Sequence, residues 1–153
     1  MNAIHLYRLG HFFHRRGVPG LPGLIKGLIF LLYNSAIPPS ATIGRGSVFA
    51  YGAIGVVIHS DAVIGAGCVI GQGITIGAAE AYASPERKGC PRIGDDVYIA
   101  AGARIIGDIT IGDRCIIGAG AIVTRSVPDG SVVAGVPARV IGATPPGYRA
   151  IRG

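Results

Sequence analysis

The feature that most constrains the fold of this chain is a period of six residues. An aliphatic residue recurs at every sixth position, as in IGAGCV IGQGIT IGAAEA and again from IGDDVY to VTRSVP. The positions are Ile58, Ile64, Ile70 and Ile76, then Ile93, Ile99, Ile105, Ile111, Ile117 and Val123, with Ile37, Ile43 and Phe49 beginning the frame upstream. Such a unit is too short for a helical repeat and is typical of a three-faced solenoid. We therefore predict an all-β solenoid with these side chains pointing inward.

The same frame defines two further positions. The residue four places after the leading aliphatic is small and should also point inward, as at Ser47, Ala62, Cys68, Ala103, Cys115 and Ala121. The residue before each leading aliphatic should face outward, and there the chain has Val57, Val63, Val69, Ile116 and Ile122. Apolar side chains on flat outer faces favour self-association, and a three-sided prism fits a ring of three subunits.

Two interruptions of the period are candidate walls of a functional site. Ile58 follows Phe49 by nine positions instead of six, and Ile93 follows Ile76 by seventeen. The second interruption is polar and contains proline and glycine, so it should leave the coil as an excursion loop over residues 78–92. Insertions in a solenoid tend to gather on its functional face.

The first 36 residues lie outside the repeat and should form a helical cap. Residues 2–16 can form a short amphipathic helix with Leu6, Leu9, Phe12 and Phe13 inward, and residues 24–33 a second helix. The favoured interpretation is a cap on the open end of the prism. The alternative is a weak contact of residues 1–33 with a membrane surface.

Charge and cysteine content limit the partners and the cellular location that we expect for this chain. The formal net charge of +6 favours anionic partners, but the basic residues are scattered and lack interleaved aromatics, so we expect no nucleic acid. Three widely spaced cysteines fit neither a disulfide framework nor a zinc pattern, and the N-terminus lacks the order of a signal peptide. These features predict a reducing, cytoplasmic location, which extends to the inner membrane face if the N-terminal segment meets it.

The hexads, the charged loop and the ending SVPDGSVVAGVPARVIG resemble the left-handed β-helix acyltransferases built of hexapeptide repeats. The likeness is greatest to serine acetyltransferase and to enzymes that O-acetylate sugars of bacterial exopolysaccharides. It implies a left-handed parallel β-helix over residues 37–142, a C-terminal tail over 143–153, and a homotrimer. It also implies acetyl-CoA as co-substrate, no metal, and direct acetyl transfer to a hydroxyl whose proton a histidine removes.

The resemblance carries the coenzyme side of the site over to matching positions. The IGAGA-type turns place backbone contacts to the pantetheine arm near Ala101 and Ala119. Gly77 and Ala78 match the small pair that opens the excursion loop. Arg125 and Arg139 are candidates for the coenzyme phosphates, because a guanidinium suits bidentate phosphate contacts.

The acceptor side departs from the pattern of serine acetyltransferases. Ala36 stands where they have an aspartate, and Tyr51 or Gly52 occupies the slot of their catalytic histidine in the first interruption. The excursion loop closes with CPRI instead of HPKI, so Cys90 replaces a histidine. Glu80, Cys90 and Arg92 are the candidate acceptor-binding residues, and the acceptor stays open between serine and a sugar hydroxyl.

His59 is the candidate general base, because it is the one histidine within the repeat and follows the first interruption directly. It occupies a corner slot that elsewhere holds glycine, so we expect a strained turn with the ring pointing outward. Asp61, Glu80 and Tyr51 are candidates to orient it. The alternative is a surface histidine without a role. Cys90 as a nucleophile is disfavoured, because no base for its thiol is evident.

Other functions on this kind of solenoid fit less well. A carbonic anhydrase of this shape needs three histidines around zinc, and the repeat contains one. An ice-binding solenoid needs a ladder of threonines, whereas Thr42, Thr75 and Thr110 are isolated. The remaining alternative to an O-acetyltransferase is a catalytically inactive scaffold or assembly protein.

Overall fold

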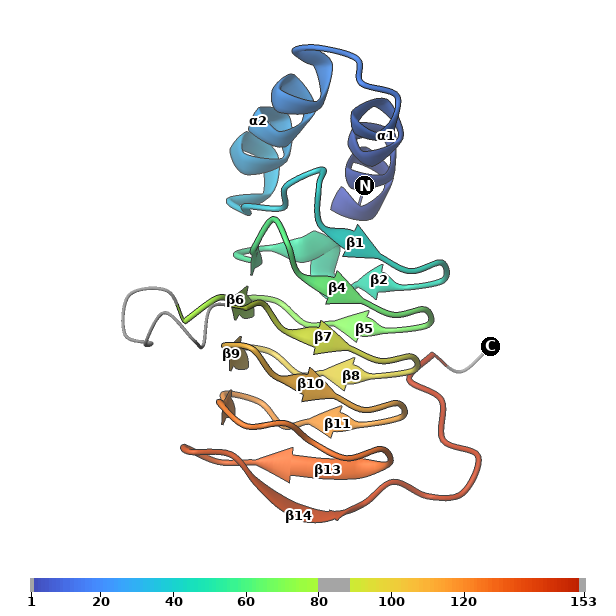
Figure 1. Ribbon diagram of the computed structural model, residues 1–153, viewed down its shortest axis with the longest axis vertical. Coiled ribbons are helices and arrows are strands. Elements are labelled where there is room, and N and C mark those ends of the chain that lie inside the picture. Colours follow the sequence, from blue (N-terminus) through green and yellow to red (C-terminus); the bar gives the residue numbers. More distant parts are fainter. Residues whose placement is uncertain (1, 80–88, 152–153) are drawn as a thin grey trace.

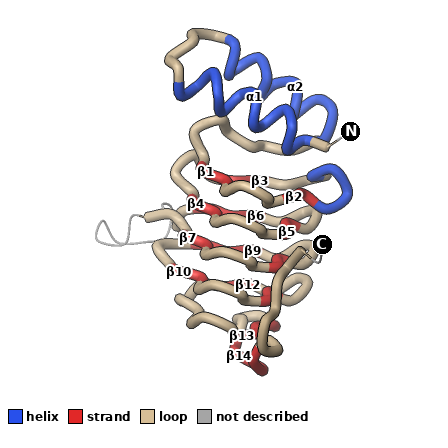
Figure 2. Tube along the Cα trace, turned by 90° about the vertical axis from the view of Figure 1, so that its right-hand side faces the viewer, coloured by secondary structure: helices blue, strands red, loops and turns tan. Residues whose placement is uncertain are grey.

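The chain winds into a three-sided prism of short strands with two helices stacked on one end (Figure 1). The computed structural model describes residues 2–79 and 89–151. Figure 2, turned by a quarter, shows the helices covering the open end of the coil above β1, β2 and β3. The expected solenoid and its short N-terminal helical segment are confirmed.

Three sheets form the sides of the prism, and nearly all neighbouring strands are parallel. Sheet A contains β3 (Val57–Ile58), β6 (Thr75–Gly77), β9 (Arg104–Ile106) and β12 (Ile122–Val123). Sheet B contains β1 (Thr42–Ile43), β4 (Val63–Ile64), β7 (Arg92–Ile93) and β10 (Thr110–Ile111). Sheet C contains β2 (Val48–Phe49), β5 (Val69–Ile70), β8 (Tyr98–Ile99), β11 (Ile116–Ile117) and β13 (Ser131–Ala134), closed by the antiparallel β14 (Arg139–Ala143).

The core of the prism is made by the residues that the period selects. The leading aliphatic residues stack in register from coil to coil, as in the pairs Ile58 with Ile76 and Ile76 with Ile105. From Ile58 to Val123 they are all buried, and so are the small residues at the second inward position, including Cys68 and Cys115. Burial raises the pKa of both thiols. Their place as core residues is confirmed.

Glycine in the corner slot is required by close stacking, and only at some corners. At the turns from sheet B to sheet C the slot holds Gly44, Gly65, Gly94 and Gly112, where a Cβ atom would collide with the backbone or an aspartate of the next coil. None of the four has positive φ. At the turns from sheet A to sheet B, here called the A–B corner, the slot holds His59, Gly77, Ile106 and Thr124.

The expected strain at His59 is therefore wrong. His59 does not have positive φ. The next slot at its corner is Gly77, where an added Cβ would make only ordinary contact, 3.5 Å from Cδ1 of Ile106. The excursion loop leaves the coil directly after Gly77, so the corner has room for side chains.

The first interruption of the period is a short 3-10 segment, η1 (Ala50–Ala53), at the turn from sheet C to sheet A. Tyr51, Gly52 and Ala53 have positive φ there. The extra residues leave the coil and return to it within the turn, so that β3 still pairs with β6 in register.

The helix α1 (Ala3–Arg15) packs on the first coil through Ala3, Ile4, Tyr7 and Gly10. The Tyr7 hydroxyl donates to the Ala41 carbonyl at 2.6 Å and accepts the Ile43 N–H at 3.2 Å. The expected face is partly wrong, because Leu9 and Phe12 are about half exposed while Leu6 and Phe13 pack on the core. The hydrogen bonds of the Tyr7 hydroxyl to the first coil orient the helix so that Tyr7 and Gly10 face the prism, one position along from the expected Leu6 and Leu9.

The helix α2 (Leu21–Tyr33) begins with a proline in its first turn and ends at Asn34, which is left-handed with φ of 50°. It packs on α1 through Pro22, Ile25 and Ile29 and leaves Leu24, Leu28, Phe30, Leu31 and Leu32 exposed. None of the described helices is long and apolar enough to cross a membrane.

Candidate active site

His59 lies at the A–B corner, directly after β3, where it is held between two sheets. Its backbone N–H donates to Ile76 at 2.8 Å, and its carbonyl accepts the N–H of Ala62 at 3.2 Å. These bonds fix the turn in the ladder of coils, while the side chain is about one quarter exposed. The imidazole is therefore a half-buried group on a rigid support.

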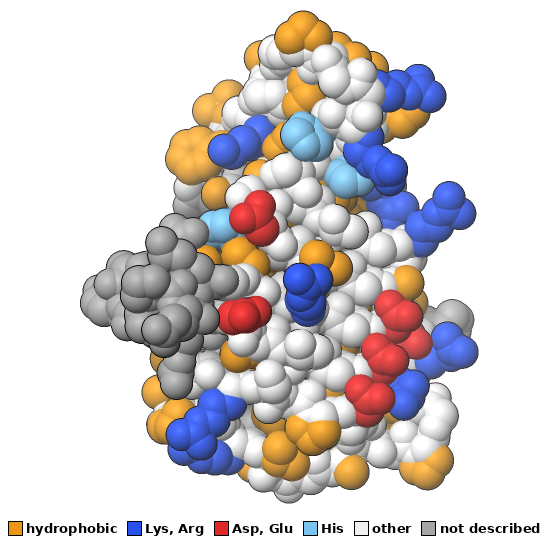
Figure 3. Space-filling view, viewed as in Figure 1, with side chains coloured by type: hydrophobic (Ala, Val, Ile, Leu, Met, Phe, Trp, Pro, Cys, Tyr) orange, Lys and Arg blue, Asp and Glu red, His pale blue; other side chains and the backbone are white. Residues whose placement is uncertain are grey.

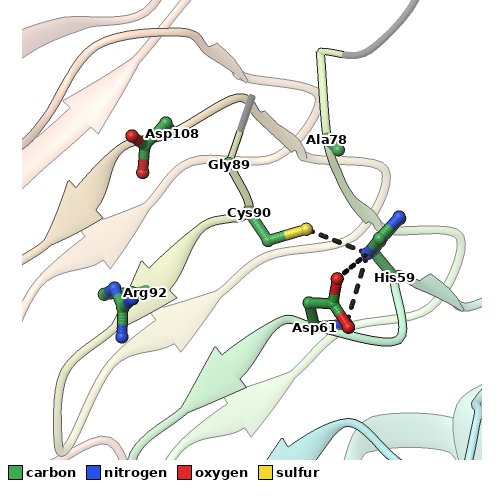
Figure 4. A pocket seen from close by; sticks show the side chains of 7 residues that line it. All are labelled: His59, Asp61, Ala78, Gly89, Cys90, Arg92 and Asp108. Atoms are coloured by element: carbon green, nitrogen blue, oxygen red, sulfur yellow. Dashed lines mark hydrogen bonds and ion pairs between the residues drawn. The ribbon is translucent and has the colours of Figure 1, made fainter. Parts of the chain in front are cut away.

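Cys90 returns from the excursion loop to this imidazole. Cys90 lies just before β7. β7 pairs with β4, and β4 is the strand that follows the His59 turn. The Sγ atom of Cys90 lies 2.9 Å from Nδ1 of His59, and Figure 4 shows the thiol and Asp61 converging on the ring. The proximity of a base to Cys90 was not evident in the sequence, because the two residues come from different coils.

The contacts of His59 define the proton arrangement of its ring. The backbone N–H of Asp61 donates to Nδ1 at 3.2 Å. Since a backbone N–H can only donate, Nδ1 is an acceptor, and the neutral ring carries its proton on Nε2. The Asp61 carboxylate lies 4.0 Å from Nδ1 and would stabilise a proton arriving there. Nδ1 is thus the basic atom of the ring, and the Cys90 thiol points at it.

A cavity of about 390 Å³ opens beside this pair, here called the loop-side pocket. It is lined by His59, Asp61, Ala78, Gly89, Cys90, Arg92 and Asp108. Arg92 and Asp108 are exposed and lie farther from the ring than Asp61 does (Figure 4). The pocket therefore combines a base, a thiol and charges of both signs, which suits a small polar substrate.

His59 also lines a second cavity of about 320 Å³ on the other side of the corner, here called the helix-side pocket. Its walls are Lys26, Ala36, Pro38, Val57, Ile58, His59, Ser60, Thr75, Ile76 and Gly77. This pocket is mostly apolar and reaches α2 through Lys26. Neither Lys26 nor Asp108 was expected from the sequence, since nothing in the hexad frame distinguishes them from other surface charges.

The residues expected at the coenzyme occupy two corners. Gly77 and Ala78 lie at the A–B corner beside His59. Arg125 lies at the same corner three coils farther along, where it lines a small cavity together with Arg139. Ala101 and Ala119 lie instead at the turns from sheet C to sheet A. Within the described part of the chain their N–H groups donate to no protein acceptor, whereas those of Gly102 and Gly120 donate to the preceding coil.

Two of the expected residues are not brought to the pair. Tyr51 is 78% exposed in η1, at a different corner from His59, and lines none of the cavities described above. It cannot orient the ring within one chain. Glu80 lies outside the described residues.

The basic atom, the thiol and the carboxylate also have the spacing of metal ligands. Among the described residues, His59, Asp61 and Cys90 each offer one ligand atom, and these atoms lie within 4.8 Å of one another. Imidazole, thiolate and carboxylate are all ligands of Zn²⁺.

The chain has clear relatives. Residues 90–125 match the family described as bacterial transferase hexapeptide, with six repeats. The serine acetyltransferase of Bacillus pumilus is 38% identical over 92% of this chain and 63% of its own length. That of Salmonella typhimurium is 36% identical over 92% of this chain and 50% of its own length. The chain thus spans 50% to 63% of the length of these relatives.

Solved structures of serine acetyltransferases also align with this chain. The serine acetyltransferase of Brucella abortus in complex with coenzyme A aligns with a TM-score of 0.84 and 35% identity, over 94% of this chain and 56% of that one. The enzyme of Vibrio cholerae aligns with a TM-score of 0.83 and 35% identity, over 94% and 54%. The resemblance expected from the hexads is confirmed: this chain is a left-handed β-helix of hexapeptide repeats, related in sequence and fold to the serine acetyltransferases.

Proposed function

We propose that this protein is an acetyl-CoA-dependent O-acetyltransferase. The observation that carries the proposal is the half-buried imidazole of His59, whose Nδ1 faces a pocket at the edge of a β-helix. The relative from Brucella abortus, with the same β-helix, has been solved in complex with coenzyme A. The alternative of an inactive scaffold gives no reason for a thiol, an imidazole and a carboxylate to converge in a cavity.

In this proposal His59 is the general base. Its Nδ1 atom accepts the proton, and the Asp61 carboxylate at 4.0 Å stabilises the imidazolium that forms. General-base catalysis contributes typically about 10²–10⁴-fold to a rate. Arg92, on the wall of the loop-side pocket, binds the acceptor, and Glu80 stays a proposed contact to it.

The coenzyme lies along the A–B corner, with its thioester at His59 and its phosphates at Arg125 and Arg139. Strands of neighbouring coils are about 4.8 Å apart, so three coils separate these ends by roughly 14 Å. Gly77 and Ala78 leave room for the arm beside His59. The backbone N–H groups of Ala101 and Ala119 in a second subunit hold the pantetheine arm. Among the described residues these N–H groups donate to no protein acceptor.

A second subunit is required because the two sets of residues lie at opposite margins of sheet A. We place three chains around an axis, with sheet C inward. The outward residues of sheet C include Val48, Val69, Tyr98 and Ile116. Those of sheet B are Thr42, Val63, Arg92 and Thr110, and those of sheet A are Val57, Thr75, Arg104 and Ile122. Sheet C therefore gains most from burial. The alanine turns, which border sheet C, then lie at the contact between subunits.

The protein acts in the cytoplasm, with α2 resting on the membrane surface. α2 carries five exposed apolar side chains, and apolar and basic side chains both lie at the helical end of the face drawn in Figure 3. The first 60 residues contain Arg8, Arg15, Arg16, Lys26 and Arg45 and no acidic residue. An apolar helix face with a positive surround suits an anionic lipid surface. The acceptor is then a sugar hydroxyl of a surface polysaccharide precursor, with serine as the second candidate.

Release of the coenzyme thiol from acetyl-CoA tests the activity. We expect release that depends on an acceptor hydroxyl, compared between serine and a panel of nucleotide sugars. His59→Ala should lower the rate by about 10²–10⁴-fold without changing the assembly. Absence of release with every acceptor would favour the scaffold, and normal turnover of the variant would reject His59 as the base.

Flotation with vesicles tests the membrane contact. The protein should float with phosphatidylglycerol vesicles and not with phosphatidylcholine vesicles. Replacement of Leu28 and Leu31 by aspartate should abolish flotation, whereas replacement of the exposed Val136, at the far end of the prism, should not. Failure of the unaltered protein to bind anionic vesicles would exclude the contact.

A further inference from the structure

We infer that Cys90 is a catalytic nucleophile, which carries the acetyl group as a thioester between coenzyme A and the acceptor. The inference rests on the proposed function and changes its mechanism from direct transfer to two successive transfers. Its basis is the pairing of Cys90 with His59 at the wall of the loop-side pocket.

The geometry of the ring decides which proton His59 can take. Nδ1 is the basic atom, because it accepts the backbone N–H of Asp61 at 3.2 Å. The Cys90 thiol lies 2.9 Å from that same atom. Proton transfer from Sγ to Nδ1 therefore needs no rearrangement.

A thiol and an imidazole at this distance form the pairing that activates cysteine nucleophiles. The thiolate attacks, and it forms when an adjacent base takes the proton. Asp61 favours the resulting imidazolium, since its carboxylate lies 4.0 Å from Nδ1. The other two cysteines have no such setting, because Cys68 and Cys115 are buried in the prism.

The first transfer balances as a thioester exchange. Sγ of Cys90 gives its proton to Nδ1 and attacks the acetyl carbonyl carbon, so a bond from carbon to Sγ forms. The bond from that carbon to the coenzyme sulfur breaks, and the leaving coenzyme thiolate takes the proton from Nδ1. A thioester and a thiol become a thioester and a thiol, so neither an oxidant nor a reductant is needed.

The second transfer uses the same nitrogen. With Sγ acetylated, no thiol proton remains at Nδ1, and the acceptor hydroxyl can give its proton there. Its oxygen attacks the acetyl carbon, the bond to Sγ breaks, and Cys90 regains its proton from Nδ1. One imidazole thus serves both steps, as it does in other covalent mechanisms.

The test is labelling of the protein by acetyl-CoA with no acceptor present. After acid quenching and proteolysis, mass spectrometry should find one acetyl group on the peptide with Cys90, removable by neutral hydroxylamine. Cys90→Ala and His59→Ala should abolish the label. Cys115→Ala is the matched control and should keep it, because alanine fills the same inward position at Ala103 and Ala121.

The outcomes separate this inference from the proposed function. Label on Cys90 that chases into product when acceptor is added supports both. Acceptor-dependent thiol release that persists in Cys90→Ala, with no label on the unaltered protein, overturns the inference and keeps the acetyltransferase. Label without chase to any acceptor keeps the nucleophile and counts against O-acetyl transfer. Circular dichroism of Cys90→Ala confirms that a loss is not unfolding.

Discussion

Sγ of Cys90 and Nδ1 of His59 lie 2.9 Å apart, although the two residues are 31 positions apart in the chain. The solenoid explains the distance. The chain makes its His59 turn after β3, completes the next coil, leaves it after β6 and rejoins it at β7, which lies beside β4. Whatever path the excursion takes, its last residues must return to the corner where His59 lies. A loop that closes with cysteine therefore presents a thiol to the imidazole.

Alkylation should distinguish Cys90 from the other cysteines. In the folded protein iodoacetamide should modify Cys90 first, because burial raises the pKa of the Cys68 and Cys115 thiols and shields them. His59→Ala should slow the reaction of Cys90. Peptide mass spectrometry over a time course measures both rates. Equal modification of the three thiols, or an unchanged rate in the variant, would speak against activation by His59.

Added Zn²⁺ should inhibit the proposed acetyl transfer. The ion can bridge His59, Asp61 and Cys90, whose ligand atoms lie within 4.8 Å of one another, and so occupy the base and the thiol together. Zn²⁺ should also protect Cys90 from alkylation, and a chelator should restore activity. Mg²⁺, which prefers oxygen ligands, is the control and should have no effect. Asp61→Asn should weaken the inhibition; unchanged inhibition in that variant would place the ion elsewhere.

The hexad period was enough to predict the fold, because a solenoid repeats one local arrangement. Each leading aliphatic residue from Ile58 to Val123 lies where the period puts it, since register is passed from coil to coil by parallel pairing. The position of His59 beside the excursion loop followed from the same frame. The expected strain of its turn was wrong, because glycine at the corner slot has a different cause at each corner.

The pairing of His59 with Cys90 could not be predicted from spacing. Because the excursion loop interrupts the six-residue period, the number of residues between His59 and Cys90 does not give the number of coils between them. Tyr51, one of two residues at the slot of the family's histidine, was a candidate to orient the ring. The structure places Tyr51 at another corner, 78% exposed. One signal was present in the sequence: the residue that closes the loop always lies one coil from the histidine turn.

The corner-specific need for glycine predicts a contrast between two substitutions. Gly65→Ala should destabilise the protein by about 1–3 kcal/mol, because its Cβ would overlap the backbone carbonyl of Gly94. Gly77→Ala should cost much less, since its Cβ would lie 3.5 Å from a flexible side chain. Urea unfolding of both variants measures the difference. Similar losses would show that stacking does not set the glycine pattern.

Charge on sheet C should break the proposed trimer. Tyr98 is 39% exposed on the outer face of sheet C, so Tyr98→Lys should leave the prism folded while it opposes packing around the axis. Sedimentation velocity should show a trimer for the unaltered protein and monomers for the variant. Thr110→Lys, on the outer face of sheet B, is the control and should stay trimeric. A trimer that survives Tyr98→Lys and dissociates with Thr110→Lys would place the axis on sheet B.

Tyr7 should make stability fall in alkaline solution. Burial raises the pKa of Tyr7 from 10.0 to about 12, so the unfolded chain loses this proton before the folded one does. The stability that Tyr7 contributes is therefore complete below pH 10 and is lost as the pH rises toward 12. Tyr7→Phe should cost about 1–3 kcal/mol near neutral pH, because it leaves the Ala41 carbonyl without its donor. Tyr7→Phe should also flatten the alkaline part of the curve of stability against pH.

Urea unfolding at a series of pH values measures both effects of Tyr7→Phe, with Tyr51→Phe, at an exposed tyrosine, as the control. An alkaline loss of the same size in Tyr7→Phe would assign the titration to another group.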